Sequence, residues 1–170
     1  QSKRSDAQSL LNDLTLVDTH NLMTQSLLQG ELHLSNQAVE LAGQSFQQAL
    51  DLNNRSMDAL IGLSKTAYLQ RDKKKAEQYI EQASKIDPTH SHLALWNAQL
   101  SQSEKHWEDA EVYYIKALEG IGAYDIMTLD KYNTISSLVD TLRAQGKMQE
   151  AFIYEDILTK STLGLVKNTF

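Results

Sequence analysis

The stretch MDALIGLSKTAYLQRDKKKAEQYIEQASKIDPTH, residues 57–90, decides the fold. Each half carries a stripe of small or apolar residues at spacings of three and four, which is the signature of one helix face. The stripe of the first half is Leu60, Leu63 and Ala67, and that of the second is Ala76, Ile80 and Ala83. Arg71 and Asp72 separate the halves, and Pro88 ends the second, because a proline cannot continue a helix. The stretch therefore predicts two helices joined by a tight turn.

Two series of alanines, here called ladders, show that this unit recurs along the chain with a period of 34 residues. The first ladder is Ala42, Ala76 and Ala110, and the second is Ala49, Ala83 and Ala117. A fixed period of this length indicates stacked helical units that bury a continuous core between neighbours. We therefore expect an all-α, right-handed α-solenoid without any sheet, which offers a curved surface to a partner.

The 34-residue helix–turn–helix, the small residues where helices cross and the closing Pro88 resemble the tetratricopeptide repeat (TPR) family. Small residues in the first helices of successive units add to the resemblance: Gly30, Ser64 and Ala98. The resemblance implies about four helix pairs between two capping elements. The predicted segments are an N-terminal cap at 1–22, repeats at 23–56, 57–90, 91–124 and 132–160, and a C-terminal capping helix or tail at 161–170.

The fourth repeat is out of phase with the other three. Ala151 lies 41 residues after Ala110, which is seven more than the period. We expect a longer first helix or a longer connection near residues 124–131, and a distorted stack at that point. Gln145-Gly146-Lys147 is the expected turn of this repeat. Its Glu155 stands at the position that is occupied earlier by Phe46, Ile80 and Tyr114.

The composition excludes several classes of function. The 170 residues carry a net charge of −6 and an isoelectric point near 5.3. This balance disfavours nucleic-acid binding, which needs clustered Lys and Arg. No apolar run is long enough to cross a membrane. The chain opens on Gln1 without a signal sequence, so we expect a trimmed fragment, and it holds no cysteine for disulfides or thiolate metal sites.

The sequence contains no convincing catalytic or metal-binding motif. His90 and His92 form an H-x-H pair, and Asp87 is the nearest third ligand, but an exposed turn is the expected structure there. Gly120-Ile121-Gly122 lacks the third glycine of a nucleotide-binding loop. No G-x-S-x-G, H-E-x-x-H or P-loop pattern occurs. We expect a non-enzymatic chain with no catalytic residue, no metal and no cofactor.

The TPR resemblance implies that the first helix of each unit lines a concave groove. The residues expected there are Leu27, Glu31, Leu34, Asp58, Ile61, Lys65, Tyr68, His92, Leu95, Gln99 and Gln102. The mixture of apolar anchors and amides favours an extended or helical peptide, with Tyr68 as its strongest contact. Leu27 and Glu31 stand where carboxylate-clamp members of the family hold cationic and amide side chains. The carboxylate-clamp mode is therefore not expected.

Two short runs are similar to bacterial members of the family: residues 58–63 (DALIGL) and 142–147 (LRAQGK). They resemble envelope TPR proteins of polysaccharide or surface-protein assembly, including the PEP-CTERM type. They also resemble the periplasmic sensor domain of membrane-bound winged-helix activators. The leading hypothesis is a scaffold that binds a protein or peptide, in the bacterial periplasm or envelope. The alternatives are a sensory input domain for signalling and a noncatalytic region of a larger enzyme.

Overall fold

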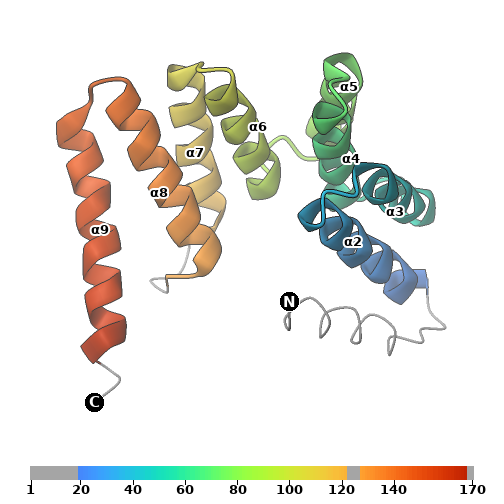
Figure 1. The fold of residues 1–170 in the computed structure, drawn as a ribbon, viewed down its shortest axis with the longest axis horizontal. Coiled ribbons are helices and arrows are strands. Elements are labelled where there is room, and N and C mark those ends of the chain that lie inside the picture. The colour runs from blue at the N-terminus through green and yellow to red at the C-terminus, as the bar shows by residue number, and fades with distance from the viewer. Residues whose placement is uncertain (1–18, 122–126, 168–170) are drawn as a thin grey trace. The chain divides into compact units, whose positions relative to one another are not determined.

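The computed structural model describes residues 19–121 and 127–167, with side chains at 21–121 and 127–161. Over these residues the chain is all-α and contains no strand, which confirms the predicted fold class (Figure 1). The helices are α2 (Thr19–Ser35), α3 (Val39–Leu52), α4 (Met57–Leu69), α5 (Lys73–Ile86), α6 (Ser91–Ser103), α7 (Trp107–Ile121), α8 (Leu129–Ala144) and α9 (Met148–Lys167). None of these helices combines the length and apolar character that a membrane crossing requires.

The helices form two compact units that divide the chain after Pro88. Unit 1 contains α2 to α5, and each of its helices packs against the next one along the chain. In unit 1, α2 also contacts α4, so the first helices of neighbouring pairs touch each other. Unit 2 contains α6 to α9 and repeats the pattern of sequential packing.

The four turns inside the helix pairs share one backbone geometry. Each has a residue with positive φ, namely Gln37 (61°), Arg71 (64°), Lys105 (64°) and Gly146 (78°). The next residue donates its N–H to the carbonyl five positions earlier, in the bonds Ala38–His33, Asp72–Ala67, His106–Ser101 and Lys147–Leu142. This pattern is the Schellman motif, which satisfies the last carbonyls of a helix. The turns therefore repeat with the same spacing of 34, 34 and 41 residues as the alanines.

The ladder alanines lie where the helices cross. All six, and Ala151 of the fourth repeat, are buried. At one crossing the Ser64 hydroxyl of α4 donates to the Ala76 carbonyl of α5 over 3.0 Å. Two helices approach this closely only where the side chains between them are small. The predicted burial of the ladders is confirmed.

The seven extra residues before the fourth repeat are spread over three places. α7 is one residue longer than α5, and α8 is three residues longer than α6. The remaining three lie between Ile121 and Leu129, where residues 122–126 are outside the described part. A longer first helix and a longer connection therefore both occur. Whether they distort the stack stays a prediction.

The two ends of the chain differ from the predicted caps where they are described. Of the N-terminal cap, residues 1–18 lie outside the described part, and residues 19–22 belong to α2. α9 runs without a break from Met148 to Lys167. Residues 161–167 therefore continue the last repeat helix, although they include Gly164, a weak helix former.

The core of unit 1 is built around one aromatic ring. Phe46 of α3 is buried with Ala42 and Leu63. A Cβ atom at Gly30 of α2 would lie 2.5 Å from the ring, and one at Gly62 of α4 would lie 2.4 Å from it. Real Cβ atoms do not approach a ring this closely. The two glycines therefore make the space that Phe46 fills.

The core of unit 2 contains a polar group. One cluster of buried residues in this unit consists of Ala98, Ala110, Tyr114, Ile135, Leu138, Val139, Leu142 and Ala151. Tyr114 of α7 is the counterpart of Phe46, two periods further along the chain. Its hydroxyl donates to Oε1 of Gln102 over 2.6 Å. A buried hydroxyl needs such a partner, because leaving it unpaired costs about 1–3 kcal/mol.

Candidate functional site

The apolar groove residues predicted in unit 1 serve the interior. Leu27 and Leu34 of α2 are half-buried and pack against the cluster that contains Phe46. Ile61 of α4 is only 4% exposed. The physical reason is that α2 and α4 contact each other as well as α3, which turns these side chains inward. Leu27, Leu34 and Ile61, which were expected in the groove, therefore contribute to the interior of unit 1.

The polar groove residues of unit 1 lie at its surface. Glu31 of α2 and Lys65 of α4 form an ion pair of 3.5 Å, with 56% and 30% of their side chains exposed. Asp58 is exposed and Tyr68 is half-buried. An exposed pair of this kind contributes at most about 1 kcal/mol to stability. The two opposite charges of this face therefore offset each other.

In unit 2 the predicted groove residues divide in the same way. Leu95 is half-buried against the core, whereas His92 and Gln99 are exposed. Gln102 is an internal residue, because its amide joins three helices. Besides accepting from Tyr114, it donates to the Ser137 carbonyl over 3.4 Å and to the Thr141 hydroxyl over 3.3 Å. Since the predicted residues come from both units, a continuous groove through all of them stays a prediction.

Sequence reasoning missed a cleft on the other side of the unit 1 helices. It lies between α3 and α5, with α4 at its base, and has a volume of about 550 Å³. Its lining residues are Glu40, Gly43, Gln44, Gln47, Gln48, Asp51, Leu63, Thr66, Ala67, Gln70, Lys75 and Tyr79. The available signal was the run of glutamines along α3, which the helical period places on its exposed side.

The cleft offers hydrogen-bonding groups of both kinds. Gln47 donates to Asp51 over 2.8 Å, whereas the exposed Gln44, Gln48 and Gln70 present amides at the surface. Each amide supplies two donor hydrogens and an acceptor oxygen. Leu63 and Tyr79 add apolar surface. The arrangement suits a neutral backbone with alternating donors and acceptors.

The described residues contain no metal-binding cluster. No group of three His, Cys, Asp or Glu side chains among them is placed to hold a metal ion. The rings of His90 and His92 meet edge to face at 5.5 Å. His90 and His92 therefore contact each other as rings, and no third metal ligand joins them.

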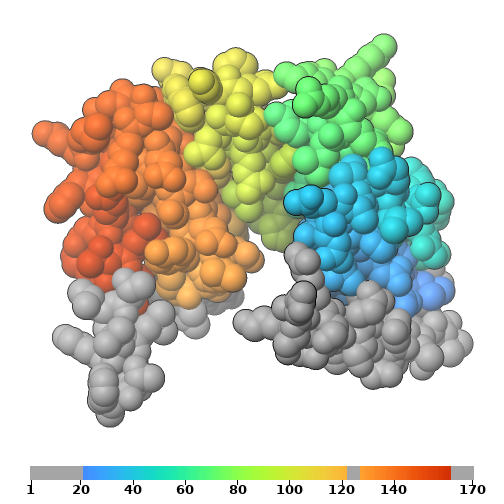
Figure 2. Space-filling view, viewed as in Figure 1, coloured from blue at the N-terminus to red at the C-terminus, as the bar shows by residue number. Residues whose placement is uncertain are grey.

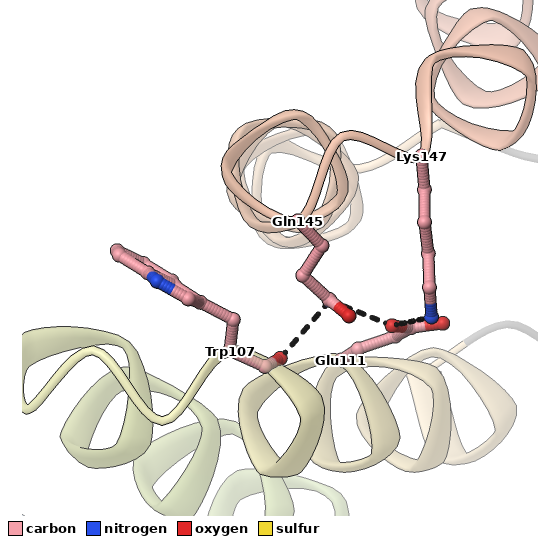
Figure 3. Close-up of polar contacts among 4 residues, drawn as sticks. All are labelled: Trp107, Glu111, Gln145 and Lys147. Carbon is pink, nitrogen blue, oxygen red and sulfur yellow. Dashed lines mark hydrogen bonds and ion pairs between the residues drawn. The ribbon is translucent and has the colours of Figure 1, made fainter.

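A polar joint ties α7 to the turn between α8 and α9 (Figure 3). The Gln145 amide donates to the Trp107 carbonyl and to Glu111, and Lys147 donates to the same Glu111 oxygen over 2.6 Å. Burial alone raises the pKa of Glu111, but the hydrogen bonds from Lys147 and Gln145 outweigh it and bring the pKa below its usual value. The Glu111 carboxylate in turn raises the pKa of Lys147. The joint therefore stays ionised at neutral pH and is a structural contact.

Comparison with solved structures identifies the fold. Pseudomonas aeruginosa PilF matches with a TM-score of 0.70 and 18% identity over 83% of this chain. MamA matches with a TM-score of 0.63 and 13% identity, and the match covers 96% of this chain and 89% of the MamA chain. YrrB matches with a TM-score of 0.58 and 17% identity, over 86% of this chain and 70% of the YrrB chain. It is described as a TPR protein with an unusual peptide-binding site.

The fold is that of a TPR solenoid. This chain spans 62% of the length of the PilF chain that it matches. At these low identities the likeness concerns the fold and not the function. No protein-family model matches the sequence, and no curated protein matches it.

Proposed function

We propose that this chain is a noncatalytic protein-interaction module that binds a peptide or an extended protein segment. The fold supports a binding role, because TPR solenoids present large surfaces between their helices. The observation that carries the proposal is the amide-lined cleft between α3 and α5 of unit 1. Its glutamines match the donors and acceptors of a peptide backbone, and Leu63 and Tyr79 accommodate an apolar side chain.

The groove residues suggested by the sequence form a second candidate surface for the same function. Tyr68 is half-buried on α4, and Lys65 and Glu31 lie at the surface of α4 and α2. We favour the cleft, because the leucines and Ile61 of the groove are engaged in internal packing. Neither surface holds the cluster of cations that would capture a carboxylate terminus.

A selection from a random peptide library on the immobilised protein tests the proposal. The selected peptide is then measured by fluorescence anisotropy against the Gln44→Ala/Gln48→Ala double variant. Loss of two hydrogen bonds of about 1 kcal/mol each predicts binding about tenfold or more weaker. Gln78→Ala is the matched control, because Gln78 is exposed on α5 and does not line the cleft.

The outcomes separate the two surfaces. Weakening by the Gln44/Gln48 change alone supports the cleft. Weakening by Tyr68→Ala alone moves the peptide to the groove face and contradicts the cleft. A library that yields no peptide with measurable affinity contradicts the module itself.

The broader context of the module is a separate proposal. A scaffold of the bacterial envelope, a periplasmic input domain of a regulator and a noncatalytic region of an enzyme would all use such a surface. The full-length gene distinguishes them. A signal peptide or lipidation motif favours the scaffold, a DNA-binding domain with one transmembrane helix favours the regulator, and a flanking catalytic domain favours the enzyme.

A further inference from the structure

The outer side of α9 presents apolar side chains that no helix of unit 2 covers in the described residues. α9 packs against α8 through its buried face, which includes Ala151, Tyr154 and Leu158. A neighbouring side of this helix, which stands at the edge of unit 2, is exposed (Figures 1 and 2). There Ile153 and Ile157 are 61% and 38% exposed.

These two isoleucines belong to a symmetric stripe, Glu150–Ile153–Ile157–Lys160. The spacings of three, four and three residues place all four on one face of the helix. Glu150 is exposed, and the Lys160 side chain is 73% exposed in an ion pair with Asp156 of the same helix. Read in either direction, the stripe gives a charged residue, two isoleucines and a residue of the opposite charge.

We propose that this stripe binds the same stripe on a second copy of the chain, in an antiparallel pair of α9 helices. A two-fold axis beside residue 155 brings Ile153 against Ile157 of the other copy. The same axis brings Glu150 against Lys160 of the other copy, and Lys160 against Glu150. A two-fold contact requires this reciprocity, in which residue i meets residue j and j meets i.

The charges decide in favour of a second copy and of the antiparallel arrangement. Parallel helices would place Glu150 beside Glu150 and Lys160 beside Lys160, which is repulsive. The antiparallel pair makes two attractive contacts beside the four isoleucines that it covers. Lys160 keeps Asp156 as a neighbour, so the other copy adds a second carboxylate to an ion pair that already exists. A single helix pair buries less area than a standard interface, so a weak dimer is expected.

Charge reversal tests the proposal on the whole chain by sedimentation velocity over a concentration series. Glu150→Lys alone and Lys160→Glu alone replace both attractive contacts with repulsive ones, and each is expected to weaken dimerisation at least tenfold. The Glu150→Lys/Lys160→Glu double variant restores opposite charges across the axis and should return to within about threefold of the parent. Glu81→Lys is the matched control, because Glu81 is an exposed ion-paired residue of another helix, α5, and is not part of the stripe.

A second pair of variants tests the apolar part. Ile153→Gln is expected to weaken the dimer about tenfold, whereas Val112→Gln, at an equally exposed position on α7, should leave it unchanged. A thermal melt shows that each variant is folded. The proposal is overturned if the parent is a monomer at submillimolar concentration. It is also overturned if the dimer persists unchanged in Glu150→Lys and Ile153→Gln, or if the double reversal fails to restore it.

Discussion

Phe46 in unit 1 and Tyr114 in unit 2 occupy the same repeat position, yet their surroundings differ. Each is buried. Twelve residues before Phe46 stands Leu34, which packs against its cluster, and twelve before Tyr114 stands Gln102, which accepts its hydroxyl. The fourth repeat has Glu155 at this position, and twelve residues earlier Arg143 forms an ion pair with it. In these three repeats, two positions twelve residues apart thus pack or pair with each other. The interaction between them is apolar in the first repeat, a hydrogen bond in the third and an ion pair in the fourth.

This comparison changes the interpretation of two predictions. Leu34 and Gln102 were expected in a binding groove, but they are the internal partners of the residues twelve positions later. Glu155 replaces the apolar and aromatic residues found at this position in the other repeats, and Arg143 compensates its charge. The second repeat has Tyr68 and Ile80 at these positions, and both are half-buried.

The largest expected effect comes from emptying the apolar site. Phe46→Ala leaves a cavity between α2, α3 and α4, because Gly30 and Gly62 have no side chains to fill it. We expect a loss of about 3–5 kcal/mol in the free energy of unfolding. Urea denaturation followed by circular dichroism measures it. A loss below about 1 kcal/mol would contradict the central role of this ring in unit 1.

Filling the same site from the other side should cost less. In Gly62→Ala, the new Cβ lies 2.4 Å from the Phe46 ring, so ring or helix must shift. Overpacking costs about 1–3 kcal/mol and exceeds the gain in helix propensity of up to about 1 kcal/mol. Gly43→Ala is the control, since its Cβ would meet only Thr66 at 3.1 Å. If both variants change the free energy of unfolding equally, the absence of a side chain at Gly62 is not what makes room for the Phe46 ring.

Removing the hydroxyl of the polar pair is expected to cost less again. Tyr114→Phe takes a donor from Gln102 and leaves its amide oxygen unpaired, which costs about 1–2 kcal/mol. Gln102→Leu in that background imitates the Phe46–Leu34 pair and should recover part of the loss. A double-mutant cycle from chemical denaturation gives the coupling energy. Additive effects would show that the two positions are independent.

The sequence predicted the fold because its evidence is periodic. Ala42, Ala76 and Ala110 recur every 34 residues, and burial at a helix crossing tolerates only small side chains. The shift to 41 residues before Ala151 likewise anticipated the longer α8. Such regularity depends on backbone geometry, which every repeat must satisfy.

The site was less predictable, because a surface depends on contacts between helices and not on position in the repeat. Ile61 reads as a groove residue, but α2 packs against α4 and buries it. The role of Gln102 follows from the hydroxyl of Tyr114, which the Phe46 repeat lacks. A search for paired changes twelve residues apart would have found it. The cleft between α3 and α5 needs the three helices placed together before it can be recognised.

The smallest expected effect on stability belongs to the ion pair of the fourth repeat, Arg143 with Glu155. The Arg143 and Glu155 side chains are 54% and 31% exposed, so water screens their attraction. Arg143→Ala should therefore reduce the free energy of unfolding by less than about 1 kcal/mol. The loss should shrink further at high salt, because added ions weaken the pair in the parent. Denaturation at low and at high sodium chloride measures both quantities, with Lys85→Ala as a control that breaks an exposed pair on α5. A loss as large as that of Tyr114→Phe, unaffected by salt, would mean that Arg143 stabilises α8 and α9 through packing of its aliphatic part and not through its charge.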